Sequence, residues 1–301
     1  MRGNKTHTNG LAKEHTVIGF IGAGVMGKSM ASHLLEAGYP VHIYSRTKEK
    51  AEDLLRKGAL WKPSAGEAAA EADVVITMVG YPSDVEEVYL GEGGILSRAR
   101  AGAYLIDMTT STPALARKIY EEAAKRGLRA LDAPVSGGDI GAREARLTIM
   151  VGGDEADFEA VKPILSVMGT NIVHQGAAGA GQHTKMCNQI AIASNMIGVC
   201  EAIHYARKAG LNPERVLDSI AAGAAGSWSL SNLAPRMIRG DFAPGFYIKH
   251  FIKDMNIALQ SAREMGLSTP GLELAKSLYE RLAQEGEADS GTQALYKWYE
   301  R

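Results

Sequence analysis

A single lysine in a long apolar stretch is the first residue of this chain whose setting suggests chemistry. Lys185 is the only Asp, Glu, Lys or Arg between Lys162 and Glu201. Burying an ammonium group is costly unless the group is paired or functional. Lys185 is therefore a candidate for proton transfer. The alternative is a lysine near a helix end whose amine extends to solvent.

The neighbours of Lys185 have the residue types that a ligand site needs. Gly181 precedes it by about one helical turn, and Asn188 and Gln189 follow three and four residues later. On a helix these residues share one face. Glycine leaves space for a ligand, while the lysine and the amides supply hydrogen-bond donors.

A glycine-rich turn near the start of the chain has the spacing of a dinucleotide-binding loop. The segment Gly22-Ala23-Gly24-Val25-Met26-Gly27 follows a β-branched apolar run and begins a helical pattern. The three glycines permit a tight turn, close approach of the backbone to a pyrophosphate, and close packing of helix on strand. An ordinary glycine-rich turn can have the same residues. The position of this turn after the first strand of a βαβ series favours dinucleotide binding.

The end of the second expected strand indicates which dinucleotide is bound. NAD-binding proteins usually place an Asp or Glu there for the ribose hydroxyls. This chain has Ser45, Arg46 and Thr47 instead. An arginine pairs with the 2′-phosphate of NADP, so we expect NADP(H) to be preferred, with NAD(H) still possible. The alternative is a solvated surface arginine.

A second turn of serine and glycine ends another expected strand. Asp132 is followed after three residues by Ser136, Gly137 and Gly138. Successive glycine N–H groups after a serine form a small site for an anion. A plain Ser/Gly loop is the alternative interpretation.

The elements that would position these residues follow an α/β pattern. Short apolar runs alternate with helical stretches, which indicates a parallel sheet built from βαβ units. The expected strands are Thr16–Ile21, Val41–Tyr44, Asp73–Met78, Tyr104–Ile106, Ala130–Ala133, Leu147–Val151 and Asn171–Val173. Beyond a glycine-rich linker the patterns are helical, over Gln182–Ala209, Asn212–Ala222, Asp254–Met265 and Gly271–Gly286.

This pattern predicts a Rossmann-like doubly wound parallel sheet followed by an all-α domain. We expect a disordered leader over 1–15, a dinucleotide-binding domain over 16–175, a linker over 176–181, and a domain for substrate and oligomerisation over 182–301. The segment Met186–Cys200 is apolar nearly all round, so its helix should be buried, in part by a second copy of the chain. A homodimer or homotetramer is expected.

Composition excludes several other classes of protein. The net charge is −1, which favours neither nucleic acid nor an anionic membrane as a partner. No apolar run is long enough to span a bilayer, and the polar start is unlike a secretory signal. Cys187 and Cys200, placed on one helix roughly 20 Å apart, cannot form a disulfide. These features predict a cytoplasmic protein, and no motif with metal-ligand spacing is present.

Taken together, the motifs resemble the β-hydroxyacid dehydrogenase family over nearly the whole chain. That family includes 3-hydroxyisobutyrate dehydrogenases, tartronate semialdehyde reductases and glyoxylate/succinic semialdehyde reductases. The resemblance rests on GFIGAGVMG (Gly19–Gly27), DMTTSTP (Asp107–Pro113), DAPVSGG (Asp132–Gly138), GAGQHTKMCNQ (Gly179–Gln189) and IKHFIKDMNIAL (Ile248–Leu259).

The resemblance implies a role for each matching residue. Lys185 would be the catalytic acid/base. The substrate would be bound by Ser136, Gly137, Gly138 and Asn188, with Gln189 beside it. Besides the glycine loop and Ser45–Thr47, the cofactor would contact Met78, Val79, Thr110 and Lys253. The substrate would be a small carboxylate-bearing hydroxyacid or semialdehyde.

Two positions depart from the family pattern. The family often has glycine where this chain has Ala145, a change expected to affect only a turn. Many members have Asn-Asn where this chain has Asn188-Gln189, which leaves open which amide faces the substrate.

Two other functions compete with this interpretation. A 6-phosphogluconate dehydrogenase has a related fold, but its helical domain is considerably longer. A non-catalytic dinucleotide sensor or scaffold would not need Lys185, and this chain retains it. The sequence leaves the hydroxyacid, the physiological direction and the number of subunits open.

Overall fold

The computed structural model describes residues 11–300. They divide into two compact units, one that ends at Lys185 and one that begins at Met186. Of the expected leader, residues 1–10 lie outside the described part, and residues 12–15 form a turn in which His15 N–H donates to Ala12 O at 3.1 Å. No helix within residues 11–300 is long and apolar enough to cross a membrane.

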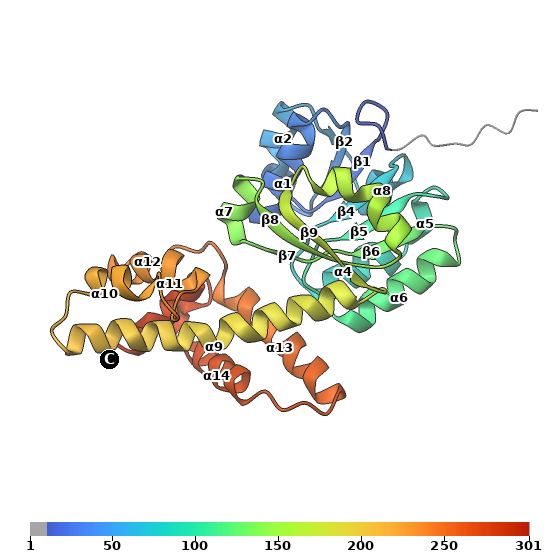
Figure 1. The fold of residues 1–301 in the computed structure, drawn as a ribbon. Coiled ribbons are helices and arrows are strands. Elements are labelled where there is room, and N and C mark those ends of the chain that lie inside the picture. Colours follow the sequence, from blue (N-terminus) through green and yellow to red (C-terminus); the bar gives the residue numbers. More distant parts are fainter. Residues whose placement is uncertain (1–10, 301) are drawn as a thin grey trace, which may run out of the picture. The chain divides into compact units, whose positions relative to one another are not determined.

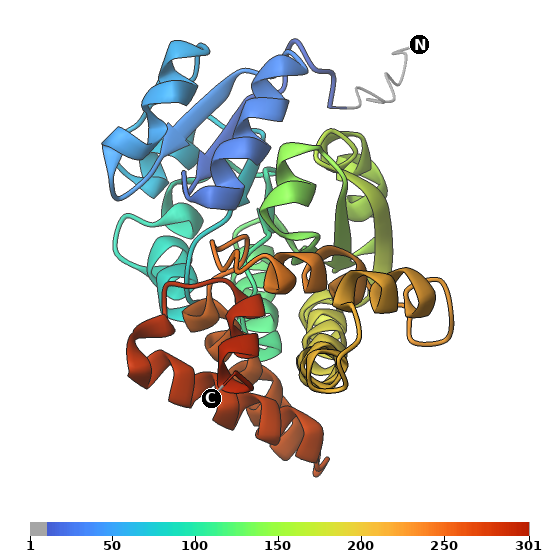
Figure 2. The same ribbon diagram turned by 90° about the vertical axis from the view of Figure 1, so that its left-hand side faces the viewer.

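The first unit is built on one nine-stranded sheet with the order β3-β2-β1-β4-β5-β6-β8-β7, and β9 pairs with β8. The strands are β1 (Ile18–Ile21), β2 (Val41–Tyr44), β3 (Leu60–Trp61), β4 (Val74–Thr77), β5 (Tyr104–Asp107), β6 (Arg129–Asp132), β7 (Val135–Ser136), β8 (Leu147–Gly152) and β9 (Gly169–Gly176). Figure 2 shows the blue β1–β3 segment at one end of this sheet and the green β8 and β9 segment at the other.

The strand order reverses beside β1, which pairs in parallel with both β2 and β4. Ile18, for example, is in register with Val41 on one side and Val74 on the other. In open α/β sheets, ligands bind at the carboxyl ends of the strands next to such a reversal. The predicted doubly wound sheet is therefore confirmed, and it brings the ends of β1, β2 and β4 to one edge.

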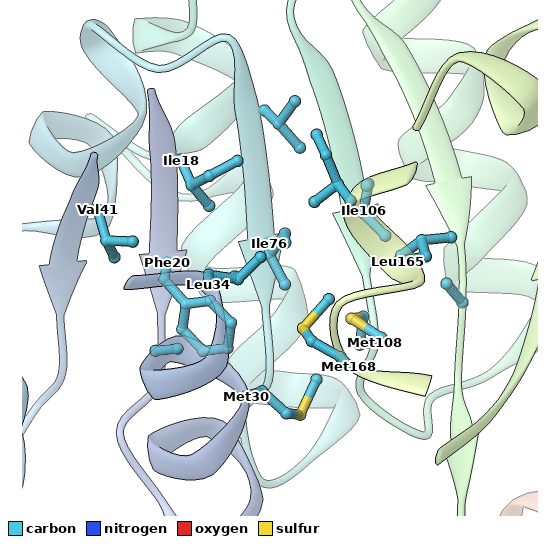
Figure 3. Close-up of a cluster of buried hydrophobic side chains, with 14 of the residues drawn as sticks. Ile18, Phe20, Met30, Leu34, Val41, Ile76, Ile106, Met108, Leu165 and Met168 are labelled. Carbon is cyan, nitrogen blue, oxygen red and sulfur yellow. The ribbon is translucent and has the colours of Figure 1, made fainter. Parts of the chain in front are cut away.

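Helices cover both faces of this sheet (Figure 1). They are α1 (Val25–Glu36), α2 (Glu52–Arg56), α3 (Ala65–Ala70), α4 (Pro82–Leu90), α5 (Ile95–Arg98), α6 (Pro113–Ala124), α7 (Gly138–Arg143) and α8 (Glu155–Leu165). Side chains that alternate along β4 separate the two cores: Ile76 packs with α1 and α8, whereas Val75 packs with α3 to α6. Figure 3 shows the first of these cores, which includes Phe20, Met30 and Leu165.

The second unit contains only helices and turns among its described residues, apart from one bridge between Tyr247 and Gly291. Its helices are α10 (Pro213–Ile220), α11 (Trp228–Asn232), α12 (Ala234–Ile238), α13 (Ile248–Glu264) and α14 (Pro270–Leu282), followed by a π-turn over Ala283–Glu287 and a 3₁₀ segment over Thr292–Trp298. The long helix α9 (Ala180–Lys208) begins in the first unit and continues into the second. Phe251, Tyr279 and Met196 are buried in the helical core.

Candidate active site

The glycine loop between β1 and α1 has the geometry of a dinucleotide cradle. Gly22 has φ +109, and a Cβ there would lie 2.1 Å from Met78 O. A Cβ on Gly27 would lie 2.1 Å from Gly22 O, so both positions require glycine. A Cβ on Gly24 would meet nothing within 4 Å. The loop thus fits a dinucleotide, with open space at Gly24 for close approach of a pyrophosphate.

Helix α1 adds an anion-binding end to this loop. Gly24 is its N-cap and supplies no side-chain hydrogen bond, and the first turn contains no acidic residue. The first N–H groups of a helix have no partner within the helix, and the helix dipole favours negative charge there. A phosphate is the ligand that this arrangement suits.

The three residues after β2 differ in exposure. Ser45 is buried, while Arg46 and Thr47 are exposed. The side chain of Arg46 is 73% exposed, and its Nη1 lies 3.1 Å from Asp84 Oδ1 at the start of α4. Asp84 also accepts a hydrogen bond from Tyr81 N–H at 3.0 Å, which fixes the carboxylate. This ion pair connects the end of β2 to the first turn of α4, and no local pattern in the sequence predicts it.

The ends of β4 and β5 are joined through a buried threonine. Val79 N–H donates to Thr109 Oγ1 at 3.0 Å, so the segment Met78–Val79 is held against the turn that contains Thr110. Thr109 N–H in turn donates to Asp107 Oδ1 at 3.1 Å. The proposed cofactor contacts Met78, Val79 and Thr110 therefore lie on two neighbouring, mutually bonded turns.

Asp107 is a buried acidic group whose carboxylate is bonded by the Thr77 hydroxyl and the Thr109 backbone N–H. Burial raises the pKa of Asp107, and hydrogen bonds from Thr77 and Thr109 oppose this effect. The resulting pKa is about 6. Thr77 Oγ1–H donates to Asp107 Oδ1 at 2.8 Å. The carboxyl group thus carries a desolvation cost that hydrogen bonds only partly offset.

The turn after β7 has the backbone of an anion site. Gly137 has φ +126 and Gly138 has φ +63, in the region that favours glycine. Ser136, Gly137 and Gly138 are each partly exposed. At the next turn, Ala145 adopts φ +51, which explains why glycine suits that position and agrees with the expectation that the change affects a turn.

Lys185 lies on the second turn of α9 and is only 7% exposed. The start of that helix is held by two buried side chains. Asp132 Oδ1 accepts from Gly179 N–H at 2.7 Å, and its Oδ2 accepts from Gln182 N–H at 2.8 Å. Gln182 Nε2–H donates to Thr109 O at 2.8 Å, and its Oε1 accepts from Ser111 N–H at 2.9 Å. Asp132 and Gln182 both stand within the motifs DAPVSGG and GAGQHTKMCNQ, but their residue types alone predict no role for them.

The remaining candidates lie in the second unit and form a chain of polar contacts. Asn188 Nδ2–H donates to Gln189 Oε1 at 2.7 Å, and Gln189 Nε2–H donates to Asp254 Oδ2 at 2.6 Å. Lys253 Nζ lies 2.8 Å from Asp254 Oδ1. Gln189 is fully buried and has a partner at each end of its amide, whereas Asn188 is partly exposed. Asp254, which lies between Gln189 and Lys253 in this series of contacts, is not among the site residues predicted from the sequence.

Neither cysteine is bonded: Cys187 is exposed and Cys200 is buried. Within residues 11–300 there is no group of three or more His, Cys, Asp or Glu side chains that could hold a metal ion.

Both halves of the chain match known families. Residues 17–176 match the family described as the NAD binding domain of 6-phosphogluconate dehydrogenase. Residues 179–299 match the family described as NAD-binding of NADP-dependent 3-hydroxyisobutyrate dehydrogenase.

Individual proteins are similar over nearly their full length. An uncharacterized oxidoreductase of Bacillus subtilis is 68% identical over 93% of this chain and 97% of that protein. The 2-hydroxy-3-oxopropionate reductase of Escherichia coli is 40% identical over 92% of this chain and 95% of that protein. The structure of 3-hydroxyisobutyrate dehydrogenase from Mycobacterium tuberculosis with L-serine has a TM-score of 0.85 and 35% identity, covering 94% of this chain and 98% of that one.

Proposed function

The chain belongs to the β-hydroxyacid dehydrogenase family, and we propose that it is an NADP(H)-linked reductase of a small semialdehyde, with Lys185 as its acid/base. It is an NAD(P)-binding oxidoreductase rather than a non-catalytic sensor. The candidate substrates are tartronate semialdehyde, glyoxylate, succinic semialdehyde and methylmalonate semialdehyde, the aldehyde that corresponds to 3-hydroxyisobutyrate. One observation carries the proposal: a lysine buried at the start of α9, within the matching motif.

The proposed chemistry needs a hydride donor, a proton donor and an anion site. A bound nicotinamide would supply or accept the hydride. In reduction, the ammonium of Lys185 gives a proton to the carbonyl oxygen, and in oxidation the neutral amine takes it back. Ser136, Gly137 and Gly138 would hold the substrate carboxylate through backbone N–H groups and the serine hydroxyl.

We assign the substrate contact to Asn188 rather than Gln189. Both amide ends of Gln189 are occupied, by Asn188 and by Asp254. Asn188 uses one donor for Gln189 and keeps its carbonyl oxygen and a second N–H. Gln189 would therefore orient Asn188, and Asp254 would orient Gln189.

The cofactor preference rests on the end of β2. Ser45 and Thr47 offer no carboxylate for ribose hydroxyls, and Arg46 offers a guanidinium. The ion pair of Arg46 with Asp84 is solvent-exposed on the arginine side, where such pairs contribute little stability. A 2′-phosphate can therefore engage the remaining guanidinium donors, and NADP(H) is the proposed cofactor, with NAD(H) as the weaker one.

The organisation of the chain completes the proposal. We propose a dinucleotide-binding domain over 16–175, a linker over 176–181 and a helical domain over 182–301, in a cytoplasmic homo-oligomer. Asp132 bonds to Gly179 and Gln182, so the end of this linker and the start of α9 are packed on the first domain.

A substrate panel tests the proposed function. Each of the four aldehydes is offered with NADPH and with NADH at neutral pH, and cofactor oxidation is followed by absorbance. We expect turnover of at least one aldehyde, with higher kcat/KM for NADPH. No turnover of any aldehyde with either cofactor would reject the proposed function, and higher kcat/KM for NADH would reject the cofactor preference alone.

A further inference from the structure

Two buried polar side chains connect the start of α9 to two separate turns of the first unit. Gln182 is fully buried and Asp132 is 4% exposed. Between them they make four hydrogen bonds of 2.7–2.9 Å, all to backbone groups. Buried polar groups with every bond made hold their surroundings in one arrangement.

The contacts of Gln182 fall on either side of a proposed cofactor residue. Its amide bonds to Thr109 O and Ser111 N–H, and Thr110 lies between them. Lys185 follows Gln182 by three residues, so the two are neighbours on the surface of α9. The position of the lysine along and around the helix is thereby tied to the turn that contains Thr110.

The contacts of Asp132 tie the same helix to the proposed substrate loop. Its two carboxylate oxygens accept from Gly179 and Gln182 at the N-terminus of α9, where the helix dipole favours a negative charge. A Cβ on Gly152 would lie 2.5 Å from Asp132 Oδ1, and a Cβ on Gly181 would lie 2.8 Å from Oδ2. Glycine at these two positions therefore leaves room for the carboxylate, and its two hydrogen bonds hold it at Asp132, four residues before Ser136.

From this geometry we propose that Gln182 and Asp132 are positioning residues, which set where the Lys185 amine lies relative to Thr110 and to the loop Ser136–Gly138. The inference rests on the proposed function, because it assigns these roles to Lys185, Thr110 and Ser136. Neither side chain touches the reacting atoms. Each acts by fixing the helix that carries the proton donor, and a displacement of about 1 Å at such a donor costs up to about 100-fold in rate.

The test begins with Gln182→Met, which keeps the length of the side chain and removes both of its hydrogen bonds. We expect kcat with the best aldehyde to fall by about 10- to 100-fold, while the Kd for NADPH changes less than threefold. With NADPH deuterated at the transferred position, the isotope effect on kcat should rise, because the chemical step becomes slower. Gln182→Glu keeps an acceptor for Ser111 N–H but, when ionised, places a buried carboxylate oxygen against Thr109 O, so its loss of kcat should be at least as large.

A double variant separates positioning from a general loss of stability. If Gln182 acts through Lys185, Gln182→Met should cause little further loss in a Lys185→Met background, since neighbouring groups acting as one unit are not additive. Tyr279→Phe is the matched control: it removes one buried hydrogen bond, from Tyr279 OH to Thr292 O at 2.8 Å, and should lower Tm without changing kcat.

The outcomes distinguish this inference from the proposed function. If Lys185→Met is inactive while folded Gln182→Met keeps its kcat, the positioning role is wrong and the proposed function stands. Multiplicative losses in the double variant would also overturn the positioning role. If Gln182→Met does not fold, Asp132→Asn and Gln182→Glu give the same comparison. If Lys185→Met itself keeps its kcat, the proposed function fails first.

Discussion

At the scale of single residues, the proposed chemistry depends most on Lys185. Lys185→Met should fold and bind NADPH, because methionine suits a buried helical position and the glycine loop is unchanged. The kcat should fall by about 10²- to 10⁴-fold with the proton donor gone. Lys185→Arg should fail as well, since guanidinium keeps its proton and is broader than an ammonium. Stopped-flow or steady-state kinetics and NADPH fluorescence measure these effects.

The matched control for Lys185 lies on the same helix. Lys208 is the exposed last residue of α9, and Lys208→Met should leave kcat unchanged. If folded Lys185→Met kept more than about a tenth of the wild-type kcat, well above what loss of a general acid allows, the lysine would be structural.

Arg46 tests the cofactor preference at the same scale. Arg46→Ala should weaken NADPH by about 1.5–3 kcal/mol, the value of one charge-assisted hydrogen bond, and leave NADH nearly unchanged. Asp84, freed from its ion pair, would then face the phosphate and add repulsion. Adding Ser45→Asp should favour NADH. Arg126→Ala, at an exposed arginine two residues after α6 that pairs with Glu122, is the control. Equal losses for both cofactors would reject the assignment.

Residue types and local spacing predicted the candidate site residues but not the side chains that these residues contact. Lys185 stood out because it is alone in an apolar stretch, and its low exposure agrees with that reasoning. Asp84 lies 38 residues from Arg46, and Asp254 lies 65 residues from Gln189. Such pairs form only when the fold brings distant turns together, so no local sequence pattern predicts them.

At the scale of elements, apolar runs located the sheet well. All seven expected strands are present, and the buried runs such as Val41–Tyr44 and Leu147–Val151 gave the clearest signal, because strands inside such a sheet are rich in β-branched and other apolar residues. The strands missed, β3 and β7, have two residues each, too few for a periodicity. Helix α13 begins at Ile248, six residues before the expected start. Ile248, Phe251 and Met255 are buried on one face, so the apolar spacing was present and the basic residues between them concealed it.

The end of β5 gives a pH-dependent prediction. The pKa of Asp107 is raised to about 6 by burial. Between about pH 4 and 6 the unfolded chain has released this proton and the folded chain retains it, so this group lowers stability as pH rises. Asp107→Asn removes the cost and keeps an acceptor for Thr77. It should stabilise the protein by at most about 3 kcal/mol at pH 8, from about two pKa units.

Urea unfolding of the Asp107→Asn and wild-type proteins at pH 8 and at pH 4.5 measures this effect. The difference in unfolding free energy should shrink at the lower pH, because the folded carboxyl group is then largely protonated and most of the cost of its buried charge is gone. A difference that is equal at the two pH values, or that favours wild type at pH 8, would contradict the account of Asp107.

At the scale of the whole molecule, α9 was expected to be buried on every side, and within the chain it is not. Met186, Ala193, Met196 and Val199 are buried. A second face is exposed and consists mainly of small side chains, at Cys187, Ala191, Ser194 and Gly198. A helix face without charge is typical of a surface that another chain covers.

This exposed face predicts that the protein is at least a dimer. Light scattering at micromolar concentration should give about 64 kDa or more, twice the 32.1 kDa of one chain. Ala191→Arg puts a charge in the middle of the face and should shift the protein toward the monomer, because an unpaired buried charge is costly at an interface. Ala124→Arg, at an exposed alanine ending α6, is the matched control and should not change the mass. A wild-type mass of about 32 kDa would mean that solvent covers this face, and an Ala191→Arg variant that keeps the wild-type mass would place the interface elsewhere.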